Sequence, residues 1–423
     1  MTKREGIHGA ALAALLMAGL AAPALAQGAA LTYPWIGTWA VAPQSGTELG
    51  GPGTSFNQQT LRQTVYTSVA GQVARVQISN TFGTQPLTIS DARIALPDPS
   101  QAGAIRPATA RQLTFGGQTS ITIPTGALAL SDPVEFPIPA LGNVVVDLYL
   151  PDATGPATQH STGLQTNYIA QGDASGQQTL PGAQTTQSYF FLTDLDVQNP
   201  PLRGAVVTLG ASITDGTAST PNANRRWPND LARRLVAAGL RVGVLNEGIG
   251  GNRLLTDVIG PNAQSRFDRD VLAQPGVRWV IFSDDPINDL GFTALPPGTL
   301  PGASPGNPTA ESLIAGLQQL IARAHQKGIK FFCSTLTPYQ GAFYWTPAGE
   351  AAREQINAFI RSPDSGCDGI VDQDTATHDP ANPTQYLPAY DSGDHLHPND
   401  AGYVAIADAV NLTLFSRAFN GGL

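Results

Sequence analysis

Ser212 is the residue of this sequence best placed to act as a nucleophile. It follows the apolar run 206–209 and a turn of small residues, so we expect it at the carboxyl end of a strand. Open α/β sheets bind their ligands outside the carboxyl ends of their strands. Asp394 and His397 lie three residues apart near the C-terminus. A serine, a base and a carboxylate that orients the base can carry out nucleophilic acyl transfer, so the sequence predicts a serine hydrolase.

Two histidines compete for the role of base. In Asp394-His395-Leu396-His397 the i, i+3 spacing of a helical turn places Asp394 and His397 on one face and directs His395 elsewhere. We therefore choose His397. A zinc site made of Asp394, His395 and His397 is the alternative, but no further His or Cys cluster completes it. His160 is isolated in the N-terminal part; a surface or structural role is the simpler interpretation, and reaching the site from there is the other.

Two more polar segments follow predicted strands. The first is 246–253, Asn-Glu-Gly-Ile-Gly-Gly-Asn-Arg, which contains Gly251. The second is 285–289, Asp-Pro-Ile-Asn-Asp, which contains Asn288. Because the carboxyl ends of parallel strands meet at one edge of a sheet, we expect these segments to lie beside Ser212.

The four segments, in this order, resemble the SGNH (GDSL-type) hydrolase family over roughly residues 203–415. The family's Ser, Gly, Asn and His correspond to Ser212, Gly251, Asn288 and His397. The resemblance implies a Ser212–His397–Asp394 triad and an oxyanion hole made by the backbone N–H groups of Ser212 and Gly251 and the side-chain amide of Asn288. It implies no cofactor and no metal.

The sequence departs from the family pattern at two positions. Ala211 stands where the family has Asp; that Asp is not the acid of the triad. Pro286 stands where the family has Gly, two residues before Asn288. Proline fixes φ near −65° and removes an N–H, so we expect the segment that carries Asn288 to take a different path.

The N-terminal part, residues 30–200, predicts an all-β domain. Short runs rich in Val, Ile, Thr and Leu alternate with polar positions and stop at Gly, Pro or Asn, as at 74–78, 119–123 and 144–150. This spacing predicts a β-sandwich or jelly roll. The segments Trp-Ile-Gly-Thr-Trp-Ala at 35–40 and Ser-Asn-Thr-Phe-Gly-Thr at 79–84 resemble the β-rich domain of a bacterial branch similar to acetyl-xylan-esterase-type proteins.

Residues 203–423 predict a catalytic α/β domain. Apolar strands at 206–209, 242–245, 279–282, 330–335 and 369–372 alternate with helices near 227–238, 262–272, 310–327, 349–360 and 400–415. This alternation is typical of a parallel sheet covered on both faces. About five strands predict a flavodoxin-like, three-layer α/β/α domain.

The first 26 residues predict an export signal. Lys3 and Arg4 precede an apolar run at 10–20 that is too short to span a bilayer, and Ala24-Leu25-Ala26 matches an A-x-A cleavage site. We therefore expect a mature chain that begins at Gln27 and is secreted or periplasmic. No later segment has the length and apolarity of a membrane helix.

The composition of this 423-residue chain indicates which classes of partner it can bind. Its formal net charge of −9 argues against nucleic acid, because binding phosphates requires a basic surface. Apolar residues make up 42%, enough for a core, and charged residues only 13%. Cys333 and Cys367 lie near neighbouring predicted strands; a disulfide between them and two free thiols both remain open.

These observations lead to one functional hypothesis and two alternatives. We expect an exported serine esterase that hydrolyses short acyl groups, such as acetyl, on a small or polymeric carbohydrate. A lipid or aryl esterase with the same mechanism is the first alternative. The second, motivated by Ala211 and Pro286, is a carbohydrate-binding protein whose catalytic domain has decayed. The sequence does not determine the oligomeric state.

Overall fold

The computed structural model describes residues 33–200, 202–257, 259–296, 299 and 308–416. The expected export signal, residues 1–26, lies outside the described residues. Pro34–Leu423 form one compact unit. It holds two large hydrophobic cores, one in the strand-rich residues 34–200, called here the β region, and one mainly in residues 202–416, called the α/β region.

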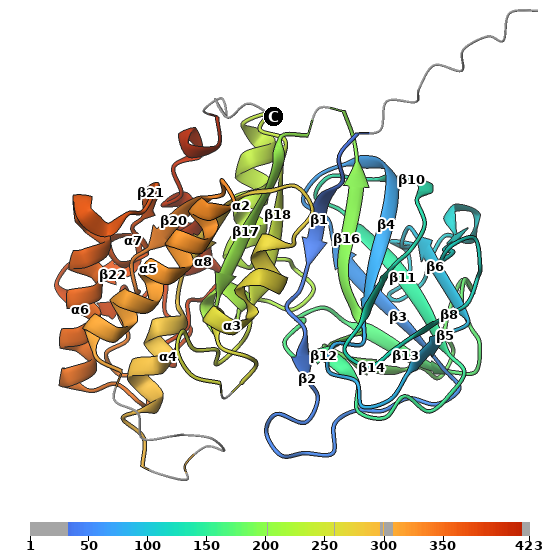
Figure 1. Ribbon diagram of the computed structural model, residues 1–423, viewed down its shortest axis with the longest axis horizontal. Helices are drawn as coiled ribbons and strands as arrows, with labels where there is room; N and C mark the ends of the chain where they lie inside the picture. The colour runs from blue at the N-terminus through green and yellow to red at the C-terminus, as the bar shows by residue number, and fades with distance from the viewer. Residues whose placement is uncertain (1–32, 201, 258, 297–298, 300–307, 417–423) are drawn as a thin grey trace, which may run out of the picture. The chain divides into compact units, whose positions relative to one another are not determined.

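Two antiparallel sheets enclose the core of the β region. One has the order β1-β16-β4-β10, with β9 paired to β4, and the other β14-β13-β3-β11-β6-β7 (Figure 1). The strands are β1 (Ile36–Ala40), β3 (Gln59–Tyr66), β4 (Gly71–Ser79), β6 (Asp91–Ala95), β7 (Arg111–Gln112), β9 (Leu128–Leu130), β10 (Val134–Ile138), β11 (Asn143–Leu150), β13 (Asn167–Gln171), β14 (Gln184–Thr186) and β16 (Leu192–Gln198). In β4, Ala74, Val76 and Ile78 are fully buried and alternate with partly exposed Arg75 and Gln77, the pattern of a strand with one face on a core. The strand-rich N-terminal region predicted from the sequence is confirmed.

Shorter strands complete this region. A small antiparallel sheet has the order β15-β12-β2, formed by β15 (Tyr189–Phe190), β12 (Thr158–His160) and β2 (Gln44–Ser45). A further pair joins β5 (Leu87–Ile89) to β8 (Ile121–Ile123). In this small sheet β12 ends at His160, and β2 leads into a turn that contains Glu48.

The α/β region is built on one parallel sheet with the order β18-β17-β19-β20-β21. Its strands are β17 (Gly204–Gly210), β18 (Val242–Gly248), β19 (Val277–Phe282), β20 (Lys330–Ser334) and β21 (Gly369–Val371). Every residue of β17 is buried, so helices and loops cover both faces of the sheet at its centre. The predicted flavodoxin-like sheet of five strands is confirmed.

Helices flank this sheet (Figure 1). They are α1 (Ser212–Asp215), α2 (Trp227–Ala237), α3 (Ala263–Phe267), α4 (Asp285–Phe292), α5 (Ala310–Gln326), α6 (Pro347–Arg361), α7 (Gln373–Thr377) and α8 (Asp400–Asp408). In α5 the apolar stripe that includes Leu313, Leu317 and Leu320 is buried. A short pair, β22 (His378–Asp379) and β23 (Asn382–Tyr386), follows α7.

Two predicted helices are shorter than expected. The helix predicted at 400–415 ends at Asp408, and a separate 3-10 turn spans Leu412–Phe415. The side chain of Asn411 accepts a hydrogen bond from the Thr413 N–H and so starts the new turn. The helix predicted at 262–272 is α-helical only as far as Phe267 and continues as a π turn, Asp268–Leu272.

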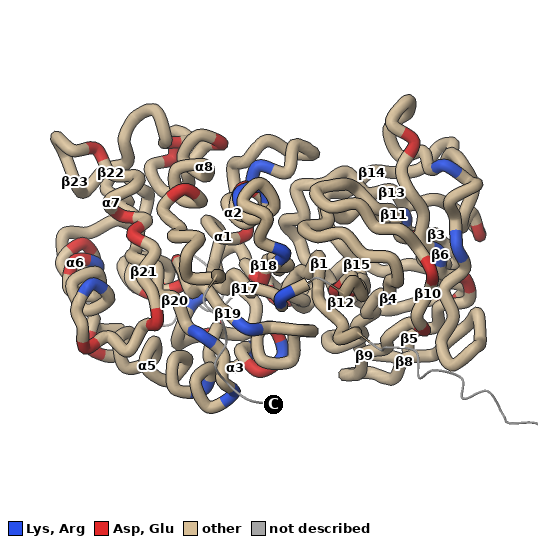
Figure 2. The backbone as a smooth tube through the Cα atoms, turned by 90° about the horizontal axis from the view of Figure 1, so that it is seen from above, with Lys and Arg blue, Asp and Glu red and all other residues tan. Residues whose placement is uncertain are grey.

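Charged residues occupy short, separated stretches of the backbone (Figure 2). This distribution agrees with a charged content of only 13%. Within the described part of the chain, no helix combines the length and the apolarity needed to cross a membrane.

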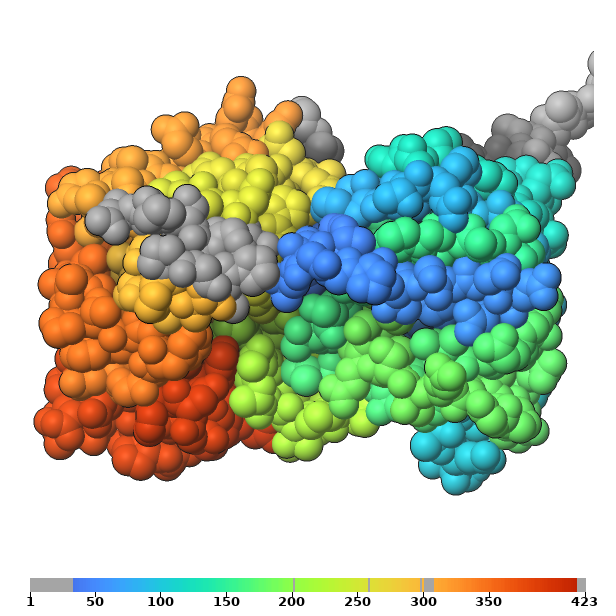
Figure 3. Space-filling view, turned by 90° about the horizontal axis from the view of Figure 1, so that it is seen from below, coloured from blue at the N-terminus to red at the C-terminus, as the bar shows by residue number. Residues whose placement is uncertain are grey.

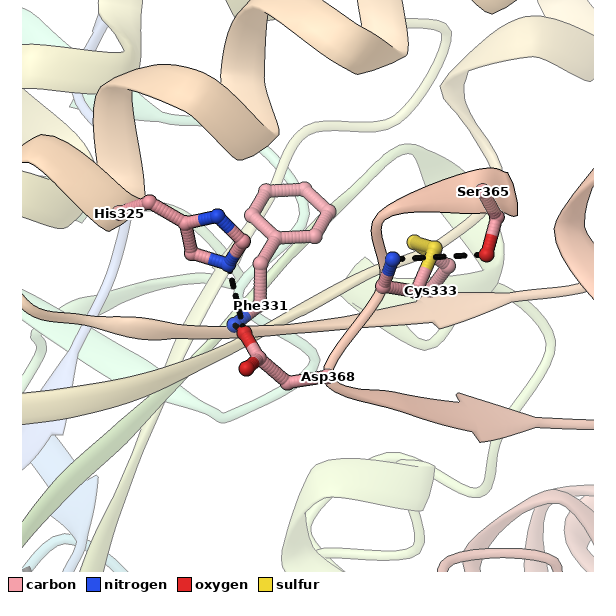
Figure 4. The surroundings of a disulfide bond; sticks show 6 residues. His325, Phe331, Cys333, Ser365 and Asp368 are labelled. Atoms are coloured by element: carbon pink, nitrogen blue, oxygen red, sulfur yellow. Dashed lines mark hydrogen bonds and ion pairs between the residues drawn. A yellow bond between two sulfur atoms is a disulfide. The ribbon is translucent and has the colours of Figure 1, made fainter. Parts of the chain in front are cut away.

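A disulfide joins Cys333 at the end of β20 to Cys367 just before β21. Figure 4 shows its surroundings, where Asp368, next to Cys367, accepts hydrogen bonds from the Phe331 N–H and His325 Nε2. The two cysteines are 34 residues apart, a loop whose closure stabilises a fold by about 3–4 kcal/mol.

Arg266 on α3 fastens the ends of two neighbouring strands together. Its side chain is fully buried and donates to the carbonyl of Gly210, the last residue of β17, at 3.0 Å and to the carbonyl of Glu247 in β18 at 2.6 Å. Its Nε also donates to Asn252 Oδ1 at 2.9 Å. The guanidinium thus holds the strand that precedes Ser212 against the strand that precedes Gly251.

The carboxyl group of Asp285 lies close to this arginine and should make stability depend on pH. Asp285 is fully buried, and its Oδ1 is 3.7 Å from Arg266 Nη2. Burial raises the pKa of Asp285 to about 7, above an unfolded value of about 3.9. The neutral form therefore favours the fold: its contribution is complete below about pH 3.9 and is lost as the pH rises through about 7.

We predict that Asp285→Asn, which resembles the neutral carboxyl, stabilises the protein more at pH 8 than at pH 5, by roughly 2 kcal/mol. Urea unfolding of both proteins at the two pH values measures this difference. Asp268→Asn, at an exposed carboxylate nearby, is the control and should show no such change. An equal effect of Asp285→Asn at both pH values would contradict the assignment.

Candidate active site

The structure brings Ser212 and His397 together from opposite ends of the α/β region. Ser212 is the first residue of α1, separated from β17 by Ala211 alone, and is 9% exposed. His397 Nε2 lies 2.8 Å from Ser212 Oγ, a hydrogen-bonding distance. The hydroxyl can therefore donate its proton to the imidazole, as a base-activated serine requires.

Asp394 completes a hydrogen-bonded chain with His397. His397 Nδ1 lies 2.6 Å from Asp394 Oδ2, so Nδ1 carries the proton and Nε2 is free to accept from the serine. Residues 394–397 do not form the helical turn assumed in choosing His397. Instead, Asp394 Oδ1 accepts the N–H groups of Leu396 and His397, which folds the segment around the carboxylate.

Hydrogen bonds from His397 keep Asp394 ionised. Partial burial on its own would raise the pKa of Asp394, but hydrogen bonds from the His397 side chain and backbone outweigh it and bring this pKa well below its ordinary value. Asp394 is thus an anion able to stabilise an imidazolium on His397.

The second histidine of the motif faces a different carboxylate. His395 Nδ1 lies 2.6 Å from Asp391 Oδ2, and the residue is held at φ +63°. His395 and His397 therefore do not converge on one point. Among the described residues, no group of three or more His, Cys, Asp or Glu side chains is arranged to hold a metal ion.

Asp284 shapes the turn that carries Ser212. This buried carboxylate accepts the backbone N–H groups of Ala211 at 3.1 Å, Ile213 at 2.7 Å and Thr214 at 3.3 Å, and the Thr214 hydroxyl at 2.6 Å. An anion at the N-terminus of a helix satisfies donors that otherwise lack partners. The Ser212 N–H is not among the groups that Asp284 binds.

Gly251 follows β18 with a backbone that suits glycine. Its φ is +82°, a left-handed conformation, and a side chain there would meet Ile259 at 2.5 Å. The N–H groups on either side are engaged: Gly250 donates to Asp215 Oδ2 at 3.1 Å and Asn252 to the Ile249 carbonyl at 2.9 Å.

Asn288 lies in α4, where Pro286 occupies the first turn. Proline is well accommodated there because N–H groups of the first turn have no partner within the helix. Asn288 Nδ2 donates to the Asn252 carbonyl at 2.9 Å, and Oδ1 accepts from the Tyr344 hydroxyl at 3.0 Å. Burial raises the pKa of Tyr344 well above its ordinary value, so it stays a donor and fixes the orientation of the amide. Among the described residues, the Asn252 carbonyl is the acceptor that Asn288 Nδ2 contacts, through one of its two hydrogens.

Asp215 links Ser212's helix to the β region. Its Oδ1 lies 3.0 Å from His160 Nε2 and 3.4 Å from Arg226 Nη1. His160 is buried and is thus placed against the α/β region, though it contacts Asp215 rather than Ser212.

The predicted site residues thus gather around the ends of β17, β18 and β19, with the segment of Asp394 and His397 beside them. Sequence reasoning missed Asp284, Asp215 and Tyr344. A signal existed for Asp284, because it lies two residues after the apolar run 279–282 that predicts a strand. No signal in the sequence pointed to Tyr344, because it lies far along the chain from Asn288.

One comparison with known proteins matches part of this chain. Residues 208–405 match the model of the GDSL-like Lipase/Acylhydrolase family. A search of curated proteins found no match.

Several solved structures are similar to about half of this chain. Axe2, an acetylxylan esterase from Geobacillus stearothermophilus, is 19% identical with a TM-score of 0.38, over 51% of this chain and 96% of its own. A GDSL-like lipase from Bacteroides thetaiotaomicron VPI-5482 is 16% identical with a TM-score of 0.37, over 52% and 92%. LAE5, an alpha/beta hydrolase enzyme from the metagenome of Lake Arreo, Spain, is 23% identical with a TM-score of 0.38, over 51% and 96%. The matched family model is what carries the assignment: residues 208–405 are a domain of the GDSL-like lipase/acylhydrolase family, and the protein is a hydrolase that acts on esters.

Proposed function

We propose that this hydrolase is a serine esterase with Ser212 as nucleophile, His397 as base and Asp394 as the residue that orients His397. The continuous chain from Ser212 Oγ to His397 Nε2 at 2.8 Å and from His397 Nδ1 to Asp394 at 2.6 Å carries the proposal. The same chain speaks against a catalytically decayed protein, because no group of the triad is missing or turned away.

The reaction proceeds in two halves. His397 Nε2 takes the hydroxyl proton while Ser212 Oγ attacks the ester carbonyl carbon, and the carbonyl oxygen becomes an oxyanion. The intermediate collapses, His397 gives its proton to the departing alkoxide, and the acyl group stays on Ser212. Water, deprotonated by His397, then releases the acid and restores the serine.

The oxyanion is stabilised by donors fixed before the substrate arrives. We assign the N–H groups of Ser212 and Gly251 and the remaining Nδ2 hydrogen of Asn288 to this role. Donors held in place by Asp284, by the φ of +82° at Gly251 and by Tyr344 need no reorganisation during the reaction.

The ester is proposed to be a short acyl group, such as acetyl, on a carbohydrate. Two polar side chains next to His397 in the chain reach solvent, namely the exposed His395 and the half-exposed Asp394. They can exchange hydrogen bonds with the hydroxyls of a sugar. The loop after β20 adds one aromatic side chain, Phe343, which is 70% exposed beside Tyr344.

Phe343 also keeps the aryl or lipid ester as a second candidate. An exposed aromatic ring can pack on an aryl group or an acyl chain as well as on the face of a sugar. The dependence of kcat/KM on acyl-chain length and the release of acetate from acetylated sugars distinguish the two candidates.

We further propose that the protein is exported. The A-x-A site at 24–26 and the Cys333–Cys367 disulfide support this, because disulfides persist in oxidising compartments. N-terminal sequencing of protein recovered from the periplasm and the medium should give a chain that begins at Gln27. A chain recovered only with the first 26 residues attached would contradict export by cleavage.

Replacing the nucleophile should abolish turnover. We predict that Ser212→Ala lowers kcat for 4-nitrophenyl acetate by about 10⁴-fold or more, because no oxygen remains to form the acyl-enzyme. Release of 4-nitrophenolate measures it. Ser312→Ala, at a partly exposed serine of α5, is the matched control and should keep full activity. Equal turnover by Ser212→Ala and wild type would rule out this nucleophile.

Acyl-chain length separates the substrate classes. We expect kcat/KM to fall at least roughly tenfold from 4-nitrophenyl acetate to the octanoate, and acetylated xylooligosaccharides to release acetate. Higher kcat/KM for the octanoate would favour the lipid esterase. Turnover of 4-nitrophenyl acetate without acetate release from any acetylated sugar would overturn the carbohydrate substrate while leaving the esterase intact.

A further inference from the structure

We propose that the β region is part of the catalytic machinery, because two of its side chains, Glu48 and His160, position the loop that carries Gly251. This loop is residues 249–253, called here the Gly251 loop. The inference rests on the proposed function, in which the Gly251 N–H stabilises the oxyanion. It assigns the β region a role in the chemical step on any ester, including one too small to contact a carbohydrate-binding surface.

Glu48 makes the first of the two contacts. It lies in the turn after β2, and its Oε2 accepts the N–H of Gly260 at 2.7 Å. Its other oxygen accepts the Ser45 N–H at 2.8 Å, which holds the carboxylate in place. Figure 3 shows this face of the protein, where blue residues of the first strands meet yellow residues of the α/β region.

The contact at Gly260 reaches the Gly251 loop through Asn252. The carbonyls on either side of Gly260, those of Ile259 and Pro261, accept hydrogen bonds from Asn252 Nδ2 at 2.8 and 2.9 Å. Asn252 is fully buried and directly follows Gly251. Glu48 therefore fixes the segment to which the side chain next to Gly251 is tied.

His160 makes the second contact, on the other side of Gly251. Its Nδ1 lies 3.0 Å from the Ala42 carbonyl and its Nε2 lies 3.0 Å from Asp215 Oδ1. Both partners are acceptors, so each ring nitrogen of His160 faces a group to which an N–H can donate. Asp215 Oδ2 then accepts the N–H of Gly250, the residue before Gly251, at 3.1 Å.

Arg226 strengthens the second contact. Its Nη1 lies 3.4 Å from Asp215, and its Nη2 donates to the carbonyl of Thr162 at 3.0 Å, in the chain segment just after β12. Asp215 is 1% exposed and so depends on these partners rather than on water for its solvation.

Gly251 thus lies between Gly250 and Asn252. The β region holds Gly250 through His160 and Asp215, and it holds Asn252 through Glu48 and the segment around Gly260. A misplacement of a catalytic group by about 1 Å can cost about 10²-fold in rate, and the loss of an oxyanion donor costs about 10²–10³-fold. Loosening the Gly251 loop should therefore lower kcat, with little effect on how a small substrate binds.

The test compares full-length variants on 4-nitrophenyl acetate. We expect Glu48→Ala and His160→Ala each to lower kcat about 10- to 100-fold with KM within about twofold of wild type. Glu48→Gln and His160→Gln should retain more activity. In Glu48→Gln the new side-chain carbonyl can still accept from Gly260, and in His160→Gln the new amide can still donate to Asp215. Inhibition by phenylboronic acid, which forms a tetrahedral adduct on a nucleophilic serine, should weaken by about the factor by which kcat falls.

Asp147→Asn is the control for a general loss of stability. It disturbs a buried ion pair with Arg62 that lies within the β region, away from the Gly251 loop. We expect it to lower Tm without lowering kcat.

The outcomes are distinct. The inference is overturned if Glu48→Ala and His160→Ala keep kcat within twofold of wild type. It is also overturned if Asp147→Asn, compared with an alanine variant of the same Tm, shows the same fall in kcat. If the alanine variants do not fold, Glu48→Leu and His160→Phe, which keep side-chain bulk but remove these hydrogen bonds, decide in the same way. Absence of Ser212-dependent turnover in wild type would instead refute the proposed function on which the inference rests.

Discussion

The carboxylate of Asp284 is the group on which the geometry around Ser212 depends most. It binds three backbone N–H groups and one hydroxyl within four consecutive residues, and it does so from the end of β19, the strand next to β17. The turn after β17 has no side-chain cap of its own, since Ala211 precedes the helix. A buried carboxylate with this many charge-assisted hydrogen bonds holds the serine in one orientation toward His397.

The remaining contacts extend this arrangement to the other donors of the site. Arg266 fixes the end of β17 against β18, and Asp289 binds the N–H groups of Leu254 and Leu255 just beyond Asn252. Burial raises the pKa of Asp289 to about 7, because an interior shielded from water disfavours the charged form. Such a site favours preorganised hydrogen bonds, because in a medium of low polarity they gain strength and require no rearrangement during reaction.

Much of this could be predicted from the sequence, and the limits have a physical origin. The strands of the parallel sheet were predictable because they are continuous apolar runs, and Ser212, Asp394 and His397 because they stand in short motifs at the ends of elements. The turn at 394–397 was assigned the wrong local structure, since a carboxylate that binds two backbone N–H groups mimics helical spacing. Glu48, Asp215 and Tyr344 could not be recognised, because each acts on a residue far away in the chain. His160 could be recognised only as a residue within reach of the site from the N-terminal part.

The proposed mechanism requires that Ser212 is an activated nucleophile paired with His397. Treatment with diethyl 4-nitrophenyl phosphate tests it most directly, because the reagent transfers a phosphoryl group to such a serine and releases one 4-nitrophenolate. We expect one equivalent of nitrophenolate per protein, mass spectrometry placing the adduct on Ser212, and a loss of labelling in His397→Ala. Labelling at another residue, or equal labelling of His397→Ala, would contradict the claim.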